Sequence, residues 1–378
     1  MYFELTEQEQ SFCDSIRDKL QSMDVSTTAS KGADIKEARA DTLEVLQVLS
    51  STGYLGMGIG DEKAKPDTVL LLAGMQVLAQ YCPELYLAVE MSTRMFGRLI
   101  HDYGTDTQKQ EILSALSRGE GVGSLALIED CMNVQDNPMQ TVGEPDGEDV
   151  RISGRKNFVI NASIADWIAV VGKMGDQTAV FIVTPEDGPK IERSVNAAGC
   201  GCADVGSVTL DNVKVPGERV IGPFSNSQVL QDIRKWEDQV LIAYSNGIIK
   251  CSLEEAQSFA QEHKSGGKPI IAYQEIGFKL AEMITLLQTA ELLAYKAAWS
   301  EMNKEKESMT LAQCAKTFCS ETAETVSSKA MQILSWQGYA FASNVEAGFR
   351  NSKYCQIAGT STEISRVRIG DAVLKGKQ

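Results

Sequence analysis

The chain has 378 residues, more than one hydrophobic core usually serves, so we expect two or three domains. Hydrophobic residues make up 43% of it and charged residues 23%, ordinary values that argue against disorder. The formal net charge of -15 argues against binding nucleic acid, because neutralising phosphate requires clustered lysine and arginine. We therefore expect a small molecule or another protein as the partner.

The beginning of the sequence and its histidines and cysteines limit the class of protein further. The stretch Met1–Glu7 is acidic and unlike a secretory signal, and no run of about 18 apolar residues occurs, so we expect a soluble cytoplasmic protein without a membrane span. The close pair Cys200 and Cys202 lacks the further ligands of a metal site. With His101 and His263 as its two histidines, the chain also lacks the pattern of a hydrolase triad. We expect no bound metal.

Residues 1–120 are predicted to form a helical domain. Thr6–Glu9 and Thr105–Gln108 each have the pattern of a capping box, which opens a helix. After the second box, Ile112 and Leu116 recur at helical spacing. The N-terminal third is therefore expected to be all-α.

Residues 121–225 are predicted to form a small antiparallel β-domain. Short runs rich in β-branched residues alternate here with Gly, Asp, Asn and Pro. These runs are Val150–Ser153, Trp167–Val171, Ala179–Val183 and Ser207–Leu210.

Residues 226–378 return to helical periodicity and are predicted to form a four-helix bundle. The segments 228–262, 273–302 and 311–335 are each long enough for bundle helices of many turns. The expected fold class is α+β multidomain, with an N-terminal all-α domain, a middle antiparallel β-domain and a C-terminal helical bundle.

A group of motifs resembles those of the acyl-CoA dehydrogenase family. The stretch Gly154–Asn161, followed by Ala165 and Asp166, resembles the family pattern Gly-x-Lys-x-Trp-Ile-Thr-Asn and then Ala-Asp. Further matches follow the family's order and cover nearly the whole chain. They are Tyr103–Thr105, Leu125–Glu129, Val213–Pro216, Gly222, Gln274, Ala281–Met283, Gln332–Leu334, Gly338–Tyr339, Arg350–Lys353 and Gly359–Ile364.

The resemblance implies FAD between the β-domain and the bundle, with an acyl-CoA thioester against its ring. It also implies an electron-transfer flavoprotein as electron acceptor, and a homotetramer or a hetero-oligomer with a paralogue, in which neighbouring subunits complete each flavin site. The positions corresponding to flavin contacts are Leu127, Ile128, Phe158, Ile160, Gln274, Gln332, Trp336, Gly338, Ser361 and Glu363. Those corresponding to substrate contacts are Val134 and Asp238.

The family reaction needs one carboxylate that takes a proton from the carbon next to the thioester carbonyl. In many members this glutamate lies near the C-terminus, where the present chain has Gly359, with Ala358 as the near alternative. A branch resembling isovaleryl-CoA and long-chain enzymes carries it ten residues before the glycine that corresponds to Gly247, which gives Glu237 here. We therefore interpret Glu237 as the catalytic base; the alternative is a solvated helix charge.

Several flavin-facing positions differ from the family pattern. Ile128 and Ile160 replace threonines and offer the ring no side-chain hydrogen bond. Phe158 replaces a tryptophan and can still pack flat against a ring. Ser335 and Trp336 replace a glycine pair beside the adenosine half, where an indole is expected to displace the usual pose.

Other replacements leave the function open. His263–Gly267 replaces Arg-x-x-Phe-Gly, with Lys264 as partial compensation, while Cys131–Val134 replaces Gly-Ala-Gly-Ser and Asp238 replaces an arginine. Besides an FAD-dependent acyl-CoA dehydrogenase, two alternatives follow. One is a flavin-deficient partner subunit beside a flavin-complete paralogue, and the other is a redox-neutral lyase or hydrolase that uses Glu237 on a thioester. The sequence does not specify the acyl group.

Overall fold

The computed structural model describes residues 5–23, 34–60, 67–130, 139–194, 203–340 and 343–375. The chain divides into two compact units, each assembled from separated segments. Unit 1 comprises Met1–Met23, Lys65–Tyr86 and Glu237–Gln378, and unit 2 comprises Asp24–Ala64 and Leu87–Trp236. These units cut across the three consecutive domains expected from the sequence, because two N-terminal helices pack with the C-terminal ones.

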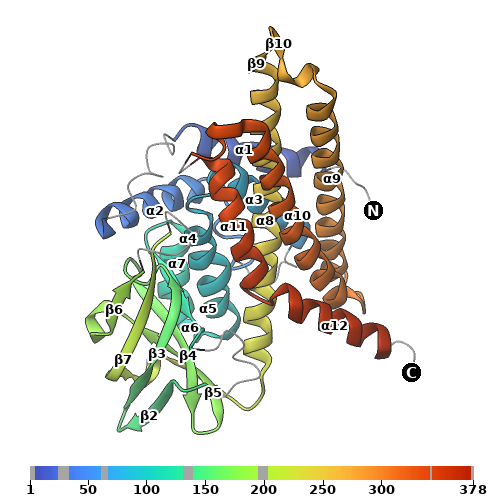
Figure 1. Ribbon diagram of the computed structural model, residues 1–378. Helices are drawn as coiled ribbons and strands as arrows, with labels where there is room; N and C mark the ends of the chain where they lie inside the picture. The colour runs from blue at the N-terminus through green and yellow to red at the C-terminus, as the bar shows by residue number, and fades with distance from the viewer. Residues whose placement is uncertain are drawn as a thin grey trace. The chain divides into compact units, whose positions relative to one another are not determined.

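Unit 1 is helical, and its long helices run alongside one another (Figure 1). A short hairpin of β9 (Lys264–Ser265) and β10 (Lys268–Pro269) joins the first two long helices. The helices are α1 (Glu7–Gln21), α3 (Thr68–Tyr81), α8 (Gln228–Glu262, in this unit from Glu237), α9 (Gln274–Met302), α10 (Ser308–Leu334), α11 (Asn344–Ile357) and α12 (Thr362–Lys375). The capping box predicted at Thr6 is confirmed.

Close contacts tie α3 to the C-terminal helices. A Cβ atom at Gly247 of α8 would lie 2.3 Å from the Cβ of Ala79, so the two helices approach each other without room for a side chain. At the other end of α3, the Thr68 hydroxyl donates to the Ala298 carbonyl at 2.7 Å. The order of helices, sheet and helices along the chain was predicted, but this long-range packing leaves no local sequence signal.

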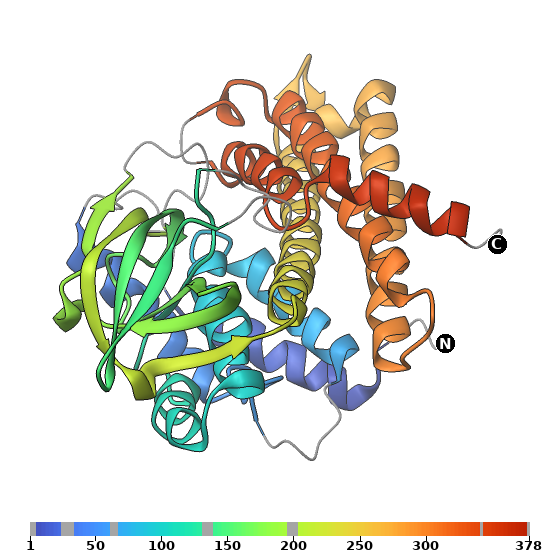
Figure 2. The ribbon, with the colours of Figure 1, turned by 90° about the horizontal axis from the view of Figure 1, so that it is seen from below.

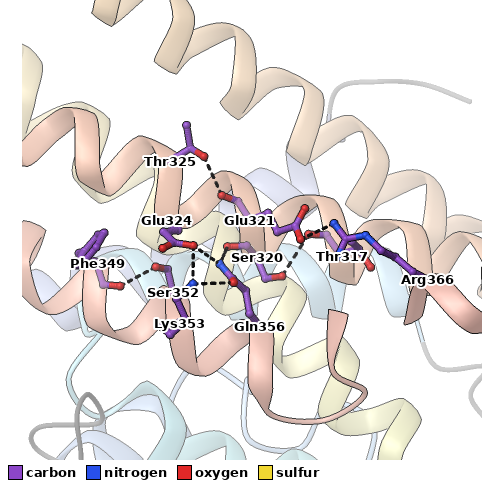
Figure 3. Close-up of polar contacts among 10 residues, drawn as sticks. All are labelled: Thr317, Ser320, Glu321, Glu324, Thr325, Phe349, Ser352, Lys353, Gln356 and Arg366. Atoms are coloured by element: carbon purple, nitrogen blue, oxygen red, sulfur yellow. Dashed lines mark hydrogen bonds and ion pairs between the residues drawn. The ribbon is translucent and has the colours of Figure 1, made fainter. Parts of the chain in front are cut away.

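A network of polar side chains fixes α11 and α12 against α10 (Figure 3). The Glu324 carboxylate accepts hydrogen bonds from Lys353 Nζ at 2.8 Å and from Gln356 Nε2 at 2.7 Å. Glu321 pairs with Arg366 of α12 at 2.5 Å. Because these groups are partly exposed, each pair contributes little stability, and their main effect is to set the register of the three helices.

Unit 2 combines short helices with one sheet. The helical segments are α2 (Ile35–Ser50), α4 (Tyr86–Glu90), α5 (Arg98–Tyr103), α6 (Asp106–Gln108) and α7 (Ser114–Ser117), with π-helical segments η2 (Met91–Gly97) and η3 (Lys109–Leu113). The capping box predicted at Thr105 is confirmed. Across the described residues, no helix has both the length and the apolar character that crossing a membrane requires.

The sheet has the strand order β6-β7-β3-β2-β4-β5-β8, with β1 added beside β4, and Figure 2 shows its strands twisting around one another. Its buried core includes Ile152, Val170, Phe181 and Val208. The strands are β1 (Gly123–Ala126), β2 (Val142–Asp146), β3 (Asp149–Ile160), β4 (Trp167–Met174), β5 (Gln177–Val183), β6 (Lys190–Arg193), β7 (Val205–Pro216) and β8 (Val220–Phe224).

The sheet is largely antiparallel, as expected, but β4 pairs in parallel with two strands, β1 and β2. β1 pairs with β4 in parallel, with Gly123 opposite Trp167. A parallel pair needs a long connection, and the chain between these strands supplies it, since it contains β2 and β3. The remaining long pairings, such as β3 with β7 and β4 with β5, are antiparallel as predicted.

Candidate functional site

Glu237 and Gly359, the two positions considered for the base, are neighbours in unit 1. Glu237 is partly buried in the third turn of α8. Gly359 follows α11 with φ of 63°, and a Cβ atom there would lie 3.5 Å from Glu237 Cγ. The stem of the glutamate therefore passes beside the backbone of the glycine, and a carboxylate carried by either position would reach the same neighbourhood.

Asp238 points into the helical core and is 3% exposed. Its Oδ1 accepts from the Thr360 amide at 2.7 Å, and its Oδ2 accepts from Gln313 Nε2 at 3.0 Å. Burial raises the pKa of this carboxyl, against the opposing effects of nearby Lys316 and these two donors. The sequence predicted a substrate contact at Asp238. In the structure, both of its carboxylate oxygens accept hydrogen bonds from groups of the protein.

Lys316 is a buried charge that the sequence reasoning missed. Its ammonium group donates to the carbonyl oxygens of Cys355 and Thr360. Burial lowers the pKa of Lys316, while the neighbouring Asp238 raises it. One feature of the sequence could have indicated its burial: Lys316 follows Ala315 on the apolar face of α10, where a lysine is uncommon.

Ser361 and Glu363 lie where α12 begins, directly after this turn. The Ser361 hydroxyl accepts from the Ile364 amide at 3.4 Å, as in a helix start. Glu363 is exposed, and hydrogen bonds from its own backbone and from Ser361 lower its pKa. The structure thus brings these two predicted residues into the same region of unit 1 as Glu237.

The other predicted residues of unit 1 lie at the far end of the bundle; they are Gln274, Gln332, Trp336 and Gly338. The ion pair between Lys329 and Glu282, at 2.8 Å, joins α9 and α10 near this end. Gln332 lies 19 residues beyond Gln313 on α10, roughly 28 Å along the helix axis at 1.5 Å per residue. One copy of unit 1 therefore presents two separate groups of predicted site residues.

The segment that ends α10 has an unusual backbone. Ser335 adopts φ of 56° and ψ of -133°, a conformation that favours glycine. The Trp336 indole is 75% exposed. Gly338 is buried, and a Cβ atom there would lie 2.9 Å from Met331 Cα. In the nearby hairpin, Lys264 is exposed.

In unit 2, Glu129 and Lys156 form a buried pair. The Glu129 carboxylate accepts from Lys156 Nζ at 2.7 Å and from the amides of Gln140 and Thr141 at 2.7 and 3.0 Å. Burial tends to raise the pKa of Glu129, but these donors outweigh it and hold the value at about 2. Lys156 also donates to the Leu127 carbonyl at 3.2 Å. The pair ties the segments after β1 and before β2 to β3, and its lowered pKa makes the Glu129 carboxylate a poor proton acceptor.

A bulge in β3 displays one aromatic ring. The register of β3 against β7 shifts between Lys156 and Val159, and Phe158 lies inside the shift with φ of 51°. A positive φ is rare for a bulky residue and often marks a functional site. Phe158 is 36% exposed, whereas the Leu127 and Ile160 side chains are buried.

Ile128 accepts the Asn157 amide at its carbonyl, at 2.8 Å, which anchors the chain beside this bulge. The segments that contain Val134 and the Cys200–Cys202 pair lie outside the described residues. Within the described ranges, no cluster of three His, Cys, Asp or Glu side chains has the arrangement of a metal site.

Two of the most recognisable motif residues have structural contacts. Asn161 Nδ2 donates to the Ala88 carbonyl at 2.9 Å and to the Gly123 carbonyl at 3.1 Å. Asp166 accepts the Val122 amide at 2.9 Å and pairs with Arg39 at 2.8 Å. Asn161 and Asp166 therefore indicate the fold of the chain rather than its chemistry.

A cavity of about 690 Å³ lies in unit 1 among α1, α3, α8 and α9. Its lining is mixed and includes Gln76, Lys250, Glu291 and Tyr295. None of the predicted site residues lines it, so it does not define the site around Glu237.

Comparisons with known proteins match one family over most of the chain. The family model described as acyl-CoA dehydrogenase, N-terminal domain, matches residues 6–120, and the model of the C-terminal domain matches residues 235–374. The probable acyl-CoA dehydrogenase YngJ of Bacillus subtilis is 26% identical, over 99% of this chain and 100% of its own. Subunit CarC of the caffeyl-CoA reductase-Etf complex of Acetobacterium woodii is 26% identical, over 90% of this chain and 92% of its own.

Among solved structures, butyryl-CoA dehydrogenase from Megasphaera elsdenii superposes with a TM-score of 0.87 at 24% identity. The superposition covers 99% of this chain and 100% of that chain. At this identity the likeness shows the fold, and it confirms the expected arrangement of an N-terminal helical domain, a middle sheet and a C-terminal helical domain.

Proposed function

This chain belongs to the acyl-CoA dehydrogenase family, FAD-dependent enzymes that oxidise acyl-CoA thioesters, and we propose that Glu237 is the base with which it does so. The observation that carries the proposal is the position of Glu237 Cγ, 3.5 Å from where a Cβ atom of residue 359 would lie. Because the two candidate positions share one neighbourhood, a glutamate on α8 can serve where residue 359 has no side chain.

The proposed reaction removes two hydrogens from adjacent carbons. The Glu237 carboxylate takes the proton from the carbon next to the thioester carbonyl, and the electron pair of that bond forms the new double bond. FAD, when bound, accepts the hydride that leaves the next carbon. A long helix suits the base, because its backbone holds the carboxylate in a fixed direction.

The residues present fit a flavin in two respects. The Phe158 ring, exposed on a strained bulge, offers a flat apolar face of the kind that packs against a ring system. Ser335 adopts a backbone conformation that favours glycine, the residue that the family pattern has there, and the Trp336 indole is exposed on the single chain. We propose that Phe158 in unit 2 and the segment from Gln332 to Gly338 in unit 1 each contribute to holding an FAD.

The predicted site residues of unit 1 form two groups that lie far apart, one around Glu237 and one around Gln332, which supports an oligomer. Gln332 and Glu237 lie at opposite ends of long helices, so one chain offers them to different sites. We propose a homotetramer or a hetero-oligomer with a paralogue, in which the Gln332–Gly338 segment of one subunit completes the flavin site of another. An electron-transfer flavoprotein is the proposed electron acceptor; the support is that one relative, CarC, is named as a subunit of a reductase-Etf complex.

The two alternatives drawn from the sequence gain no support. The relatives described above carry the names of dehydrogenases or of a reductase, which favours a redox enzyme over a lyase or hydrolase. The exposed Phe158 ring on its strained bulge favours a chain that holds a flavin of its own over a flavin-deficient partner subunit.

The first test is the absorption spectrum of the purified protein, followed by release and quantification of flavin. Near-stoichiometric FAD is expected, and an anaerobic panel of butyryl-, isovaleryl-, glutaryl- and 3-phenylpropionyl-CoA should then bleach its visible band. A protein that takes up no flavin even when FAD is supplied would overturn the proposal.

The second test is Glu237→Gln, which keeps the shape of the side chain but cannot accept the proton. Loss of a general base is expected to slow bleaching by at least about 100-fold, with flavin content unchanged. The matched control is Glu262→Gln, at the exposed end of the same helix, where we expect the wild-type rate. Equal rates for the two variants would remove Glu237 as the base.

A further inference from the structure

The turn formed by Gly359 and Thr360 is held by two buried charges of opposite sign. Asp238, the residue after Glu237, accepts the Thr360 amide at 2.7 Å. Lys316, fully buried, donates to the Thr360 carbonyl at 3.2 Å. Both peptide groups of Thr360 are thus bound by charged side chains, one from α8 and one from α10.

Neither charge would be stable without the other. Burial raises the pKa of Asp238 and lowers that of Lys316, and each charge counteracts the effect of burial on its neighbour. Gln313 completes the cluster, because its Nε2 donates to Asp238 and its Oε1 accepts from Ser365 at 2.8 Å. A satisfied network of this kind rigidifies the segment that it binds.

The same contact excludes a side chain at residue 359. A Cβ atom on Gly359 would lie 2.5 Å from Asp238 Oδ1 and 3.1 Å from Leu241 Cδ1. The backbone φ of 63° adds strain for any residue other than glycine. A carboxylate at residue 359 and a carboxylate at Asp238 that binds Thr360 are therefore alternatives.

We propose that Asp238 is a positioning residue, which with Lys316 holds the Gly359–Thr360 turn against the stem of Glu237 and reserves the adjoining space for that glutamate. This inference rests on the proposed function of Glu237 as the base. One steric clash, between a side chain at residue 359 and Asp238, then explains two departures from the family pattern: the glycine at residue 359 and the aspartate in place of an arginine. Asp238 itself needs no contact with substrate.

A stability cycle tests the geometry without any assay of activity. Gly359→Ala is expected to lower the midpoint of thermal unfolding in the wild-type protein. A variant with both Asp238→Ala and Lys316→Met lacks the two buried charges and serves as the background. In this background, Gly359→Ala should lower the midpoint of thermal unfolding much less. Additive effects would overturn the proposal. If this background does not fold, Asp238→Ser takes its place in the cycle.

The catalytic readout separates positioning from stability. In the holoenzyme, under anaerobic conditions, we compare bleaching by whichever acyl-CoA of the panel reduces the wild type. Asp238→Ala is expected to slow bleaching per bound flavin by about 10- to 100-fold, while the acyl-CoA Kd stays within about threefold. Asp238→Asn retains an acceptor for the Thr360 amide but lacks the charge opposite Lys316, so its rate should lie between those of Asp238→Ala and the wild type.

An unchanged rate per bound flavin in Asp238→Ala would overturn the positioning role. If no acyl-CoA bleaches the wild type, the proposed function fails, and the stability cycle still decides whether Asp238 holds the turn.

Discussion

Single residues in this protein carry backbone conformations that their side chains disfavour. Ser335, at the end of α10, has the φ and ψ of a glycine, and Phe158 has a positive φ inside a bulge. Such strain persists where the surrounding structure imposes it, and it gathers at functional sites. The resemblance to the family identified both positions as altered, but the strained backbone at each became visible only in the structure.

The strain at Ser335 gives a first prediction. Ser335→Gly should stabilise the protein by about 1 kcal/mol, because glycine adopts this conformation without a Cβ clash. Ser335→Ala serves as the control and should bring no gain. The measurement is the free energy of unfolding in urea, and a neutral or destabilising Ser335→Gly would contradict the prediction.

The pair of Glu129 and Lys156 gives a second prediction, on pH. The pKa of Glu129 is lowered in the folded protein to about 2, so its stabilising effect is full above the ordinary range near 4.5 and is lost as the pH falls towards 2. Glu129→Gln should cost about 3 kcal/mol at pH 7, since it leaves a buried lysine unpaired. Urea unfolding at pH 7, 5 and 3 gives the difference in free energy of unfolding between the wild type and Glu129→Gln. A difference that does not shrink as the pH falls would contradict the prediction.

At the scale of elements, the sequence was most informative where structure is local. Capping boxes at Thr6 and Thr105 marked helix starts, and short runs rich in β-branched residues between turn residues marked the strands near Val150 and Ala179. Pairing over long distances could not be predicted, because the parallel neighbour of Gly123 depends on the whole fold. The same applies to Asp238, whose burial depends on a turn more than a hundred residues away.

The approach of α8 to α3 gives a third prediction. Gly247→Val should destabilise the protein by about 3 kcal/mol, since a side chain there would collide with Ala79. Gly277→Ala, on α9, is the matched control: nothing lies within 4 Å of its Cβ position, so better helix propensity should make it neutral or stabilising by up to about 1 kcal/mol. Thermal unfolding compares the two, and similar effects would contradict the packing described here.

At the scale of the whole molecule, the site could be predicted only in part. The position of Glu237 came from its spacing to Gly247, and its nearness to Gly359 emerged from the structure. The separation of Gln332 from Glu237 also emerged from the structure, because it depends on helix direction. That separation makes the subunit arrangement testable.

Complementation between variants gives a fourth prediction. Glu237→Gln and Gly338→Val, which crowds Met331, should each be inactive alone. In mixed assemblies about a quarter of the sites should combine an intact Glu237 from one chain with an intact Gly338 from another, and bleach with acyl-CoA. Native mass spectrometry confirms mixing. Mixed assemblies without activity would show that each site uses both residues of one chain.

The interleaving of the two units has a consequence for synthesis on the ribosome. The chain contributes three segments to unit 1 and two to unit 2, so it passes four times from one unit to the other. Thr68 of α3 meets Ala298, a residue 230 positions later, so the early helices leave the ribosome long before their partners exist. A prematurely terminated product would expose the apolar face of α3, which makes it a substrate for chaperones and proteases. Neither unit corresponds to one continuous stretch of the gene.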